Sequence, residues 1–341
     1  MAEKIKSIRG MPTLLPAELK LWQSVESEIK KILSSYAYLE IRTPLLERTE
    51  LFHRTIGEQT DVVSKEMYSF LDRKDQSLSL RPEATAGVVR AGIEHGLFYN
   101  QTQKFWSMGP MYRYERPQKG RYRQFHQVNM EAFGYEGPGI DAELIIMTSR
   151  IWKNLGIDSI QLELNSLGTS ESRKNYRATL VEYFKDRIGL LDEDSLLRLE
   201  KNPMRILDSK NQEMSELIDS APKMNDHLDQ ESRDHFNDLL QRLDDHDINY
   251  VINHRLVRGL DYYTKTVFEW TTDKLGSQAT VCGGGRYDDL VKQLGGKDVF
   301  GIGCAIGFER LVELVELSGK KEQNGQPKIY LVAVGDRAEA K

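Results

Sequence analysis

Positively charged side chains are concentrated between positions 113 and 123, in a stretch that also carries aromatic residues. Glu115 is the only acid there, and the cations are Arg113, Arg116, Lys119, Arg121 and Arg123. A guanidinium group binds phosphate through two parallel hydrogen bonds and keeps its proton at physiological pH. The stretch therefore indicates a site for an anionic ligand such as a phosphate.

The residues around this basic stretch are typical of a long β-hairpin. Two arms rich in aromatic and other apolar residues, 105–115 and 122–133, flank a loop of Pro, Gly, Lys and Arg. Side chains alternate between faces along a strand, so alternate residues of the second arm are expected on one face. These residues are Arg123, Phe125, Gln127, Asn129 and Glu131. The mixture is unlike an apolar core face or an ordinary solvent face, and it predicts a floor for a flat, negatively charged molecule.

A solvated basic hairpin without any ligand is the alternative interpretation of the same residues. We rank it second, because Gln127 and Glu131 continue the polar row beyond the charged loop and into the apolar part of the arm.

Four segments resemble, in the same order along the chain, the motifs of one enzyme family. They are 113–125, which resembles motif 2 of the class II aminoacyl-tRNA synthetases in its histidyl-tRNA synthetase version; 256–263 and 283–288, which resemble the two histidine-specific motifs of that family; and 301–310, which resembles motif 3. Ile8–Met11 and the segment around Pro44 fit as well. The resemblance runs from near Ile5 to the end of the chain.

The resemblance implies activation of an amino acid by ATP, a reaction in which two anions must meet. The protein has mainly to position the carboxylate against the α-phosphate and to neutralise their charge. By resemblance, Arg113 holds the α-phosphate and the attacking carboxylate, and Arg258 opposes it, in a place that many class II relatives give to a metal ion. Arg113 and Arg258 are thus the implied catalytic residues. The implied partners of the outer phosphates are Arg121, Arg123 and Arg310.

The adenine ring and the metal ion of ATP have implied partners as well. Phe125 and the plane of the Arg310 guanidinium are expected to enclose the adenine ring, and Glu115 is expected to accept a hydrogen bond from its amino group. Mg²⁺ is implied as a bridge between the β- and γ-phosphates, with no metal site made from protein side chains alone.

Histidine is the amino acid that the resemblance implies. Glu131 and Tyr263 resemble the pair that reads the imidazole ring, and the ammonium group is implied to contact Glu83, Thr85 and Gln127. The full set of implied histidine-binding residues is Glu83, Thr85, Arg113, Gln127, Glu131, Arg258, Tyr262, Tyr263 and Tyr287. A site that bonds both ring nitrogens discriminates against analogues without them by roughly 10⁴–10⁵.

Ordinary structural roles remain open for the same residues. The tyrosines are also explained as core aromatics with a satisfied hydroxyl, Glu131 as a member of an ion pair, and Arg258 as a partner of Asp261. Glu83 and Thr85 follow Pro82 at a predicted strand-to-helix junction, where they are also explained as helix caps.

The resemblance also implies macromolecular partners. Arg116 and Gln118 in the hairpin loop resemble residues that contact the acceptor end of tRNA, so tRNA(His) is the implied second substrate. The segment around Pro44 forms the dimer interface in this family, which implies a homodimer. A bent edge strand is an alternative explanation for Pro44, because proline lacks a ladder donor.

Composition excludes several classes of protein. With 341 residues and a formal net charge of −5, the chain as a whole does not attract phosphate, so basic groups must act locally. No apolar run approaches the roughly 18 residues that span a bilayer, and the charged N-terminus MAEKIKSIRG has no signal-peptide core. Cys282 and Cys304 are the only cysteines, which excludes a disulfide scaffold. We expect a cytoplasmic protein without a membrane partner.

The expected fold is α+β: a class II synthetase-like antiparallel β-sheet flanked by helices, with an all-helical insertion. The expected parts are 1–169 and 248–320 for the catalytic core, 170–247 for the insertion, and 321–341 for a linker and the start of a truncated anticodon-binding domain. We expect such a shortened chain to activate histidine but to charge tRNA poorly, because the anticodon contact is absent.

Individual elements follow from periodicity and end signals. Helices are predicted over 16–36, from about 85 to 95, and over 141–155, 286–294 and 306–317. The helix over 141–155 is predicted to have Asp141 as its N-terminal cap and to end at Gly156. Strands are predicted over 38–46, 67–71, 78–80, 160–164, 248–253, 266–271 and 328–335. The scattered His227, His235 and His246 are interpreted as surface residues rather than a metal site, since they lack metal-ligand spacing.

Two other functions compete with the synthetase interpretation. A dinucleotide fold is disfavoured because Gly301–Gly307 reads G-x-G-x-x-x-G and not G-x-G-x-x-G. The stronger alternative is a non-catalytic histidine sensor such as the regulatory subunit of ATP phosphoribosyltransferase, which resembles a synthetase core without the anticodon domain. The complete arginine set, the hairpin loop and the helical insertion favour the synthetase.

Overall fold

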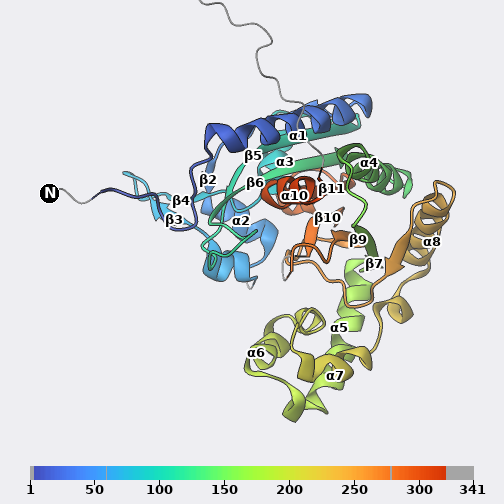
Figure 1. Cartoon of the computed structure of the whole chain (residues 1–341). Helices are drawn as coiled ribbons and strands as arrows, with labels where there is room; N and C mark the ends of the chain where they lie inside the picture. Colours follow the sequence, from blue (N-terminus) through green and yellow to red (C-terminus); the bar gives the residue numbers. More distant parts are fainter. Residues whose placement is uncertain (1–3, 59, 277–278, 320–341) are drawn as a thin grey trace, which may run out of the picture.

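An eight-stranded sheet lies at the centre of the computed structural model, which describes residues 4–58, 60–276 and 279–319 (Figure 1). Its strands, in spatial order, are β1 (Leu39–Glu40), β5 (Gln103–Tyr112), β6 (Gln124–Phe133), β11 (Gly301–Gly307), β10 (Thr280–Arg286), β9 (Thr264–Thr271), β7 (Gln161–Ser166) and β8 (Tyr250–Ile252). A smaller sheet contains β2 (Leu46–Arg48), β4 (Ser77–Leu80) and β3 (Ser69–Leu71).

The large sheet is antiparallel in its middle and parallel at its two edges. Strands from β5 to β7 pair antiparallel, whereas β1 pairs parallel with β5 and β8 pairs parallel with β7. Parallel neighbours need a long connection, and the chain provides one in each case. The α+β synthetase-like fold is confirmed, and the mixed edges refine the expected antiparallel sheet.

One face of the sheet is covered by four helices. They are α1 (Pro16–Ser35), α4 (Gly139–Leu155), α8 (Gln230–Asp244) and α10 (Phe308–Leu317). The apolar stripe of α1, with Trp22 and Ile29, packs in the same core as Val128 and Met130 of β6. Because side chains alternate along a strand, Gln127, Asn129 and Glu131 belong to the opposite face.

The opposite face of the sheet carries the aromatic residues of the candidate site. A second apolar cluster there contains Phe133, Tyr262, Tyr263 and Tyr287. It also includes residues of α3 (Thr85–Glu94) and α9 (Leu290–Gln293). Next to it, α2 (Thr49–Ile56) and the short π-helix η1 (Val62–Glu66) form a small core of their own.

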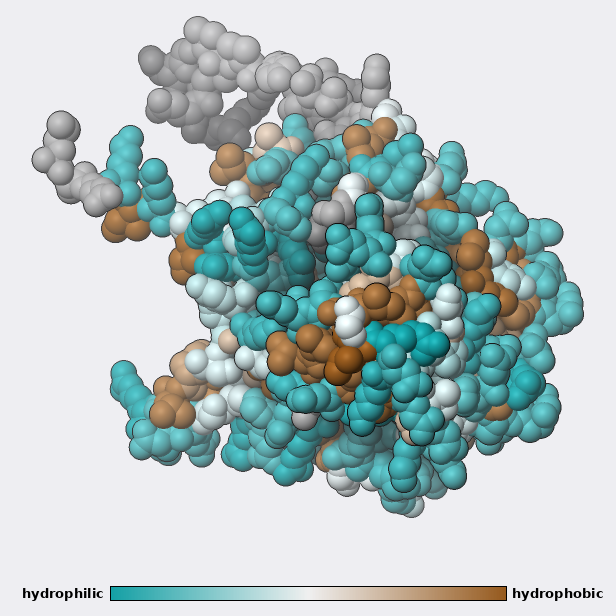
Figure 2. Space-filling model, turned by 90° about the horizontal axis from the view of Figure 1, so that it is seen from below, coloured by the Kyte–Doolittle hydropathy of each residue, from teal (hydrophilic) through white to brown (hydrophobic). Residues whose placement is uncertain are grey.

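The segment between β7 and β8 contains helices and no strand within the part of the chain that the structure describes. Besides α8, they are α5 (Ser170–Lys185), α6 (Glu193–Lys201) and α7 (Ser215–Asp219), with short 3₁₀ turns η2 (Ile188–Leu190), η3 (Pro203–Ile206), η4 (Gln212–Met214) and η5 (Met224–His227). Figure 1 shows α5, α6 and α7 grouped below the sheet. Figure 2 views the molecule from below and shows a patch of apolar side chains surrounded by hydrophilic ones.

Two predictions around α4 are wrong. Asp141 is not a cap, because α4 begins at Gly139 and the Asp141 carboxylate is fully buried. His235 is not a surface residue: it is 8 % exposed, and its Nε2 lies 2.9 Å from Asp141 Oδ2. The apolar face of α8 packs onto α4 and carries His235 inward, a contact that local periodicity does not reveal.

Some boundaries of helices and strands differ from the predicted ones near glycine and proline residues. The predicted strand 38–46 is split into β1 and β2 around the bend at Pro44. Arg286 ends β10 instead of beginning a helix, and Ile306 lies in β11, so α10 begins at Phe308. Glycine disfavours strands in general, which hides the glycine-rich β10 and β11. The predicted strand 328–335 lies outside the described residues.

No helix among the described residues is both long and apolar enough to cross a bilayer.

Candidate active site

A cavity of about 180 Å³ lies over β6, β10 and β11, on the face that α1, α4 and α10 leave open. Three arginines from distant parts of the sequence meet in its lining: Arg113 after β5, Arg258 before β9, and Arg310 in α10. Other predicted ATP- or histidine-binding residues in the lining are Glu115, Arg121, Phe125 and Gln127. The fold thus gathers most of the basic residues that the sequence singled out.

Backbone carbonyls hold two of these arginines in place. Arg113 Nε donates to Pro82 O at 3.0 Å, and its guanidinium lies 5.3 Å from the centre of the Phe125 ring. Arg310 donates to Gly120 O at 3.0 Å and to Thr280 O at 2.5 Å. The donors of both side chains are therefore fixed before any ligand binds.

The arginines crowd one another electrostatically. Burial lowers the pKa of Arg310, and the nearby Arg121 and Arg113 lower it further. Burial is likewise the main cause of the lowered pKa of Arg113. Like charges gathered in a partly enclosed cavity favour an anionic ligand, because such a ligand relieves the repulsion.

Arg258 pairs with an acid that the sequence analysis did not single out. Its Nη1 forms an ion pair with Glu269 of β9, and its guanidinium lies 5.7 Å from the centre of the Tyr263 ring. The alternative partner Asp261 instead accepts a hydrogen bond from Asn202 at 3.0 Å. Glu269 had a signal in the sequence, since it is the only acid in the otherwise uncharged part of the strand from Thr266 to Thr271.

Glu131 does not line this cavity but is almost fully buried beside it, and the same holds for the other predicted histidine-binding residues Glu83, Thr85, Tyr262, Tyr263 and Tyr287. Its carboxylate accepts hydrogen bonds from Thr85 Oγ1 at 2.7 Å and from the Tyr287 hydroxyl. Burial raises the pKa of Glu131 to about 8, although both hydrogen bonds act in the opposite direction. A carboxyl group in such a state is suited to a ligand that brings a proton donor or a positive charge.

Aromatic rings form a wall beside Glu131. The ring centres of Tyr262 and Tyr263 are 4.6 Å apart, and those of Tyr262 and Tyr287 are 5.6 Å apart. All three side chains are buried. They are core aromatics as well as neighbours of Glu131, so the structural and ligand-binding interpretations coexist.

Glu83 caps the following helix. Its carboxylate accepts hydrogen bonds from the backbone N–H groups of Thr85 at 2.6 Å and Ala86 at 2.9 Å. Burial is the main cause of its raised pKa. The cap holds the Glu83 carboxylate and the Thr85 hydroxyl together near Glu131.

Two glycines make room for the charged side chains. A Cβ atom at Gly303 would lie 1.8 Å from Glu131 Oε2, and one at Gly283 would lie 2.6 Å from Arg258 Nη1. Side chains in these strand positions would therefore displace Glu131 or Arg258. The glycines of β10 and β11 at these two positions keep this part of the sheet open for the site.

Some predicted residues do not join the cavity. Arg123 stacks over Tyr114 at 3.9 Å and donates to Glu115 O at 3.1 Å, because β6 begins only at Gln124 and the predicted alternation does not reach it. The predicted tRNA contacts Arg116 and Gln118 are exposed in the hairpin loop. Within the cavity, the Glu115 carboxylate forms an ion pair with Arg121.

Several buried polar atoms near the site have no hydrogen-bond partner among the described residues. They are Gln127 Oε1, Asn129 Nδ2 and Arg258 Nε. Leaving such an atom unpaired costs about 1–3 kcal/mol. A polar ligand on this face offers partners for these atoms.

The acids around the cavity do not form a metal cage in the described part of the chain, which has no group of three acidic, His or Cys side chains with suitable positions. Glu309 lines the cavity, but its carboxylate accepts hydrogen bonds from His126 N and lies 2.9 Å from His126 Nδ1. The side chains around the cavity therefore fit a Mg²⁺ ion that would be bound mainly by phosphate oxygens and not by protein carboxylates.

The sheet with its arginine-lined open face defines the catalytic fold of a class II aminoacyl-tRNA synthetase. The chain belongs to the histidyl-tRNA synthetase family, because the family model described as Histidyl-tRNA synthetase matches residues 10–311. A solved structure of apo histidyl-tRNA synthetase from S. aureus is 38 % identical, with a TM-score of 0.80, and the match covers 99 % of this chain and 80 % of that one.

More distant structures share the fold. An ATP phosphoribosyltransferase regulatory subunit/histidyl-tRNA synthetase from Bacillus halodurans is 21 % identical, with a TM-score of 0.69 over 92 % of this chain and 84 % of that one. A histidyl-tRNA synthetase from Nostoc is 19 % identical, with a TM-score of 0.62 over 93 % and 75 %. The two descriptions show that this fold serves proteins with different names.

Proposed function

We propose that this protein is a histidine–tRNA ligase. It activates L-histidine with ATP to histidyl-adenylate, releases pyrophosphate, and transfers histidine to the 3′ end of tRNA(His). The observation that carries the proposal is that Arg113, Arg258 and Arg310 line one cavity. Arg258 also packs against Tyr263, which belongs to the aromatic wall beside Glu131. Family membership and the resemblance to the S. aureus enzyme support it.

In the proposed first step, Arg113 and Arg258 neutralise the histidine carboxylate and the α-phosphate as the two approach. The carboxylate oxygen forms a bond to phosphorus, and the bond to the pyrophosphate oxygen breaks. Arg121 and Arg310 contact the outer phosphates, and Phe125 and Arg310 enclose adenine. Mg²⁺ that arrives with the nucleotide would supply further neutralisation of the phosphate charge.

Recognition of histidine is assigned to the polar groups beside the aromatic wall. Glu131 and Tyr263 read the imidazole ring, while Glu83, Thr85 and Gln127 contact the ammonium group. The buried, unpaired Gln127 Oε1 supports this assignment, because an ammonium donor would satisfy it. The hydrogen bonds that fix Glu131 keep one geometry ready for the ring.

Transfer to tRNA is assigned to the hairpin loop. Arg116 and Gln118 are exposed and precede the cavity-lining Gly120, so an acceptor end on this loop would reach the adenylate. The assignment of Arg123 to an outer phosphate has less support, because its guanidinium lies over Tyr114. We retain residues 170–247 as an insertion between two parts of a catalytic core in a cytoplasmic enzyme.

A homodimer is proposed through the edge near Pro44. Leu39, Leu46, Phe70 and Leu71 are large apolar residues of β1, β2 and β3 that are between 41 % and 63 % exposed. They lie on β1, an edge strand of the large sheet, and on β2 and β3, the two outer strands of the small sheet. Exposed apolar groups of this size favour association. Light scattering on the chain would show a dimer, and Leu39→Asp with Phe70→Asp would shift it toward monomer; a monomeric parent protein would contradict the proposal.

Histidine-dependent exchange of pyrophosphate into ATP tests the function directly. A ligase supports exchange with histidine, whereas a histidine sensor binds the amino acid without exchange. Charging of tRNA(His) transcripts then tests the second step. The sensor alternative is kept because the fold is shared with a structure described as an ATP phosphoribosyltransferase regulatory subunit/histidyl-tRNA synthetase.

A further inference from the structure

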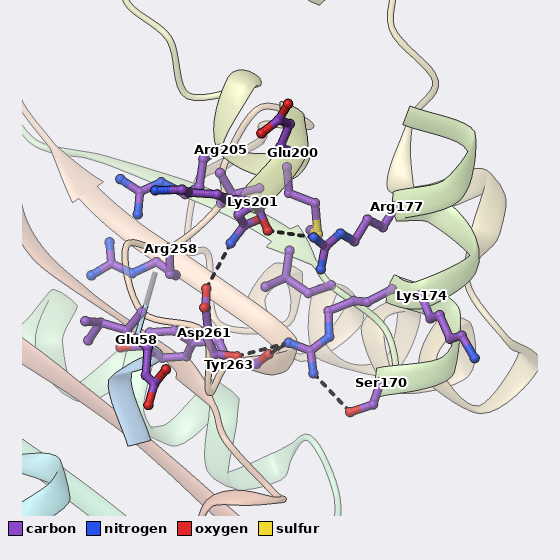
Figure 3. A pocket seen from close by; sticks show the side chains of 16 residues that line it. Glu58, Ser170, Lys174, Arg177, Glu200, Lys201, Arg205, Arg258, Asp261 and Tyr263 are labelled. Atoms are coloured by element: carbon purple, nitrogen blue, oxygen red, sulfur yellow. Dashed lines mark hydrogen bonds between the residues drawn. The ribbon is translucent and has the colours of Figure 1, made fainter. Parts of the chain in front are cut away.

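The connection between β8 and β9 carries Arg258, Tyr262 and Tyr263 and lies between the sheet and the helical segment. A second pocket, of about 500 Å³, opens on the far side of this connection. Figure 3 shows Arg177, Lys174 and Ser170 on one helix, with Asp261, Tyr263 and Arg258 on the other side of the pocket. The Lys174 and Arg258 side chains point away from each other in this view. The candidate site and the helical segment thus share the same short loop.

Side chains of the helical segment bind the backbone of that loop. Arg173 of α5 donates from Nη1 to Tyr263 O, with Asp261 O at 3.4 Å. Arg205 of η3 donates from Nη1 to Gly259 O at 3.3 Å. The three carbonyls belong to every second residue of the loop. Gly259 is next to Arg258, Asp261 is next to Tyr262, and Tyr263 is itself a predicted site residue.

A third contact binds the loop through a side chain. Asn202 Nδ2 donates to Asp261 Oδ1 at 3.0 Å. On the core side, Asp261 N donates to Ile56 O at 3.1 Å. Asp261 is therefore held from both directions, two residues before Tyr263.

The two arginines are themselves anchored. Arg173 Nη2 donates to Ser170 Oγ at 3.0 Å, and the Ser170 hydroxyl donates to Asp289 Oδ2 at 2.9 Å. Arg205 Nη2 lies 3.6 Å from Asp61 Oδ2. Since Asp61 and Asp289 lie outside the helical segment, each arginine links three parts of the molecule at the loop.

We infer that Arg173 and Arg205 are positioning residues that set the placement of Arg258 and Tyr263 and thereby the affinity for the amino acid. The inference rests on the proposed amino-acid site and not on catalysis. Arg173 acts through the forked geometry of its guanidinium, which reaches a carbonyl and a hydroxyl together. Lysine has the charge without the fork, so Arg173→Lys does not restore the function of Arg173.

Histidine affinity is the first measurement. Arg173→Ala is expected to raise the Kd for histidine, measured by calorimetry, about tenfold or more, the effect of losing a charged hydrogen bond. Arg205→Ala has a similar effect, and Arg173→Lys resembles Arg173→Ala. The KM for ATP in exchange changes less than the Kd for histidine, because Arg113 and Arg310 are held by carbonyls outside this loop.

Lys174→Ala is the matched control. Lys174 is the exposed neighbour of Arg173, lines the same pocket and carries the same charge. Its removal is expected to leave the Kd for histidine within about twofold. An equal loss of affinity in Lys174→Ala and Arg173→Ala would overturn the inference, because pocket charge and not loop placement would then matter.

Hydrogen exchange of the loop gives a readout independent of function. In Arg173→Ala, peptides covering 256–263 should exchange about tenfold faster, while peptides of α1 stay unchanged. Unchanged exchange and unchanged histidine affinity would refute the inference. A second outcome separates the inference from the proposed function. If the parent protein shows no histidine-dependent pyrophosphate exchange but Arg173→Ala still speeds hydrogen exchange of the loop, the ligase function is refuted and the positioning role is supported.

Discussion

Arg258 is the residue at which the two halves of the proposed chemistry meet. It shares a cavity with Arg113 and Arg310, and it packs against Tyr263 on the amino-acid side. Arg258→Ala is expected to reduce histidine-dependent exchange by about 10²–10³-fold, the usual effect of removing a preorganised electrostatic contact. Arg242→Ala, which breaks an exposed pair on α8, is the control, and full activity of Arg258→Ala would exclude Arg258 from the mechanism.

Glu131 makes stability depend on pH. Its folded-state pKa is raised to about 8 from 4.5, with burial as the main cause. The unfolded chain therefore loses the proton first, and the free energy of unfolding falls as pH rises from 4.5 to about 8, then levels off. The loss is up to about 5 kcal/mol, since one unit of pKa corresponds to about 1.4 kcal/mol.

Glu131→Gln tests this dependence together with recognition. The neutral amide has no proton to lose, so urea unfolding should show a smaller fall of stability across the same pH range. The variant should at the same time lose histidine-dependent exchange, because the imidazole ring loses its carboxylate partner. A variant with the parent pH profile of stability would show that Glu131 does not titrate in this range.

At the scale of elements, β11 decides whether Glu131 has room. Gly303→Ala places a methyl group where Glu131 Oε2 lies, at 1.8 Å. We expect the variant to fold, as judged by circular dichroism, but to bind histidine at least about tenfold more weakly, because the carboxylate must rotate away. Gly189→Ala, with open space around it, is the control. Parent-like binding by Gly303→Ala would mean that Glu131 has other positions available.

Local sequence pattern predicts the hairpin arms well and the glycine-rich strands poorly. β5 and β6 have aromatic and other apolar residues, and their predicted ranges agree with the structure to within a few residues. β10 and β11 contain glycine where the site needs space, and glycine has a low strand propensity. Sequence-based prediction of strands therefore fails at these functional positions. The site arginines could be predicted from chemistry and resemblance, but the position of Arg123 depends on where β6 begins.

At the scale of the whole molecule, one buried cluster ties three elements together. Asp141 of α4 accepts hydrogen bonds from Arg286 Nε at 2.8 and 3.0 Å and lies 2.9 Å from His235 of α8. Burial pushes the pKa of Asp141 up, but Arg286 and His235 outweigh it and leave the pKa below its usual value. This contribution to stability is present above the usual Asp range and is lost only as pH falls below it.

Breaking this cluster is expected to destabilise the fold strongly. Asp141→Asn should lower the free energy of unfolding by about 3 kcal/mol or more, because it removes one of the two carboxylates that pair with the buried Arg286, the other being Asp288. Asp238→Asn, in an exposed pair on α8, should cost less than about 1 kcal/mol. Urea unfolding measures both, and equal small effects would show that Asp288 and the carbonyl contacts satisfy Arg286.

Contacts between distant segments were beyond reach of the sequence alone. Glu269 with Arg258, His235 with Asp141, and Arg173 with Tyr263 are each separated by many residues, and local periodicity contains no information on such pairs. The contact between His235 and Asp141 is the reason that neither residue has the role that local sequence predicts for it. Three-dimensional packing, not residue type, decides those roles.

Pyrophosphate exchange with each of the twenty amino acids tests the central claim most directly. The proposed arrangement of arginines beside Glu131 and Tyr263 predicts exchange with histidine and none above background with the others. Absence of exchange with histidine, in a folded protein that binds histidine and ATP, would contradict the ligase function.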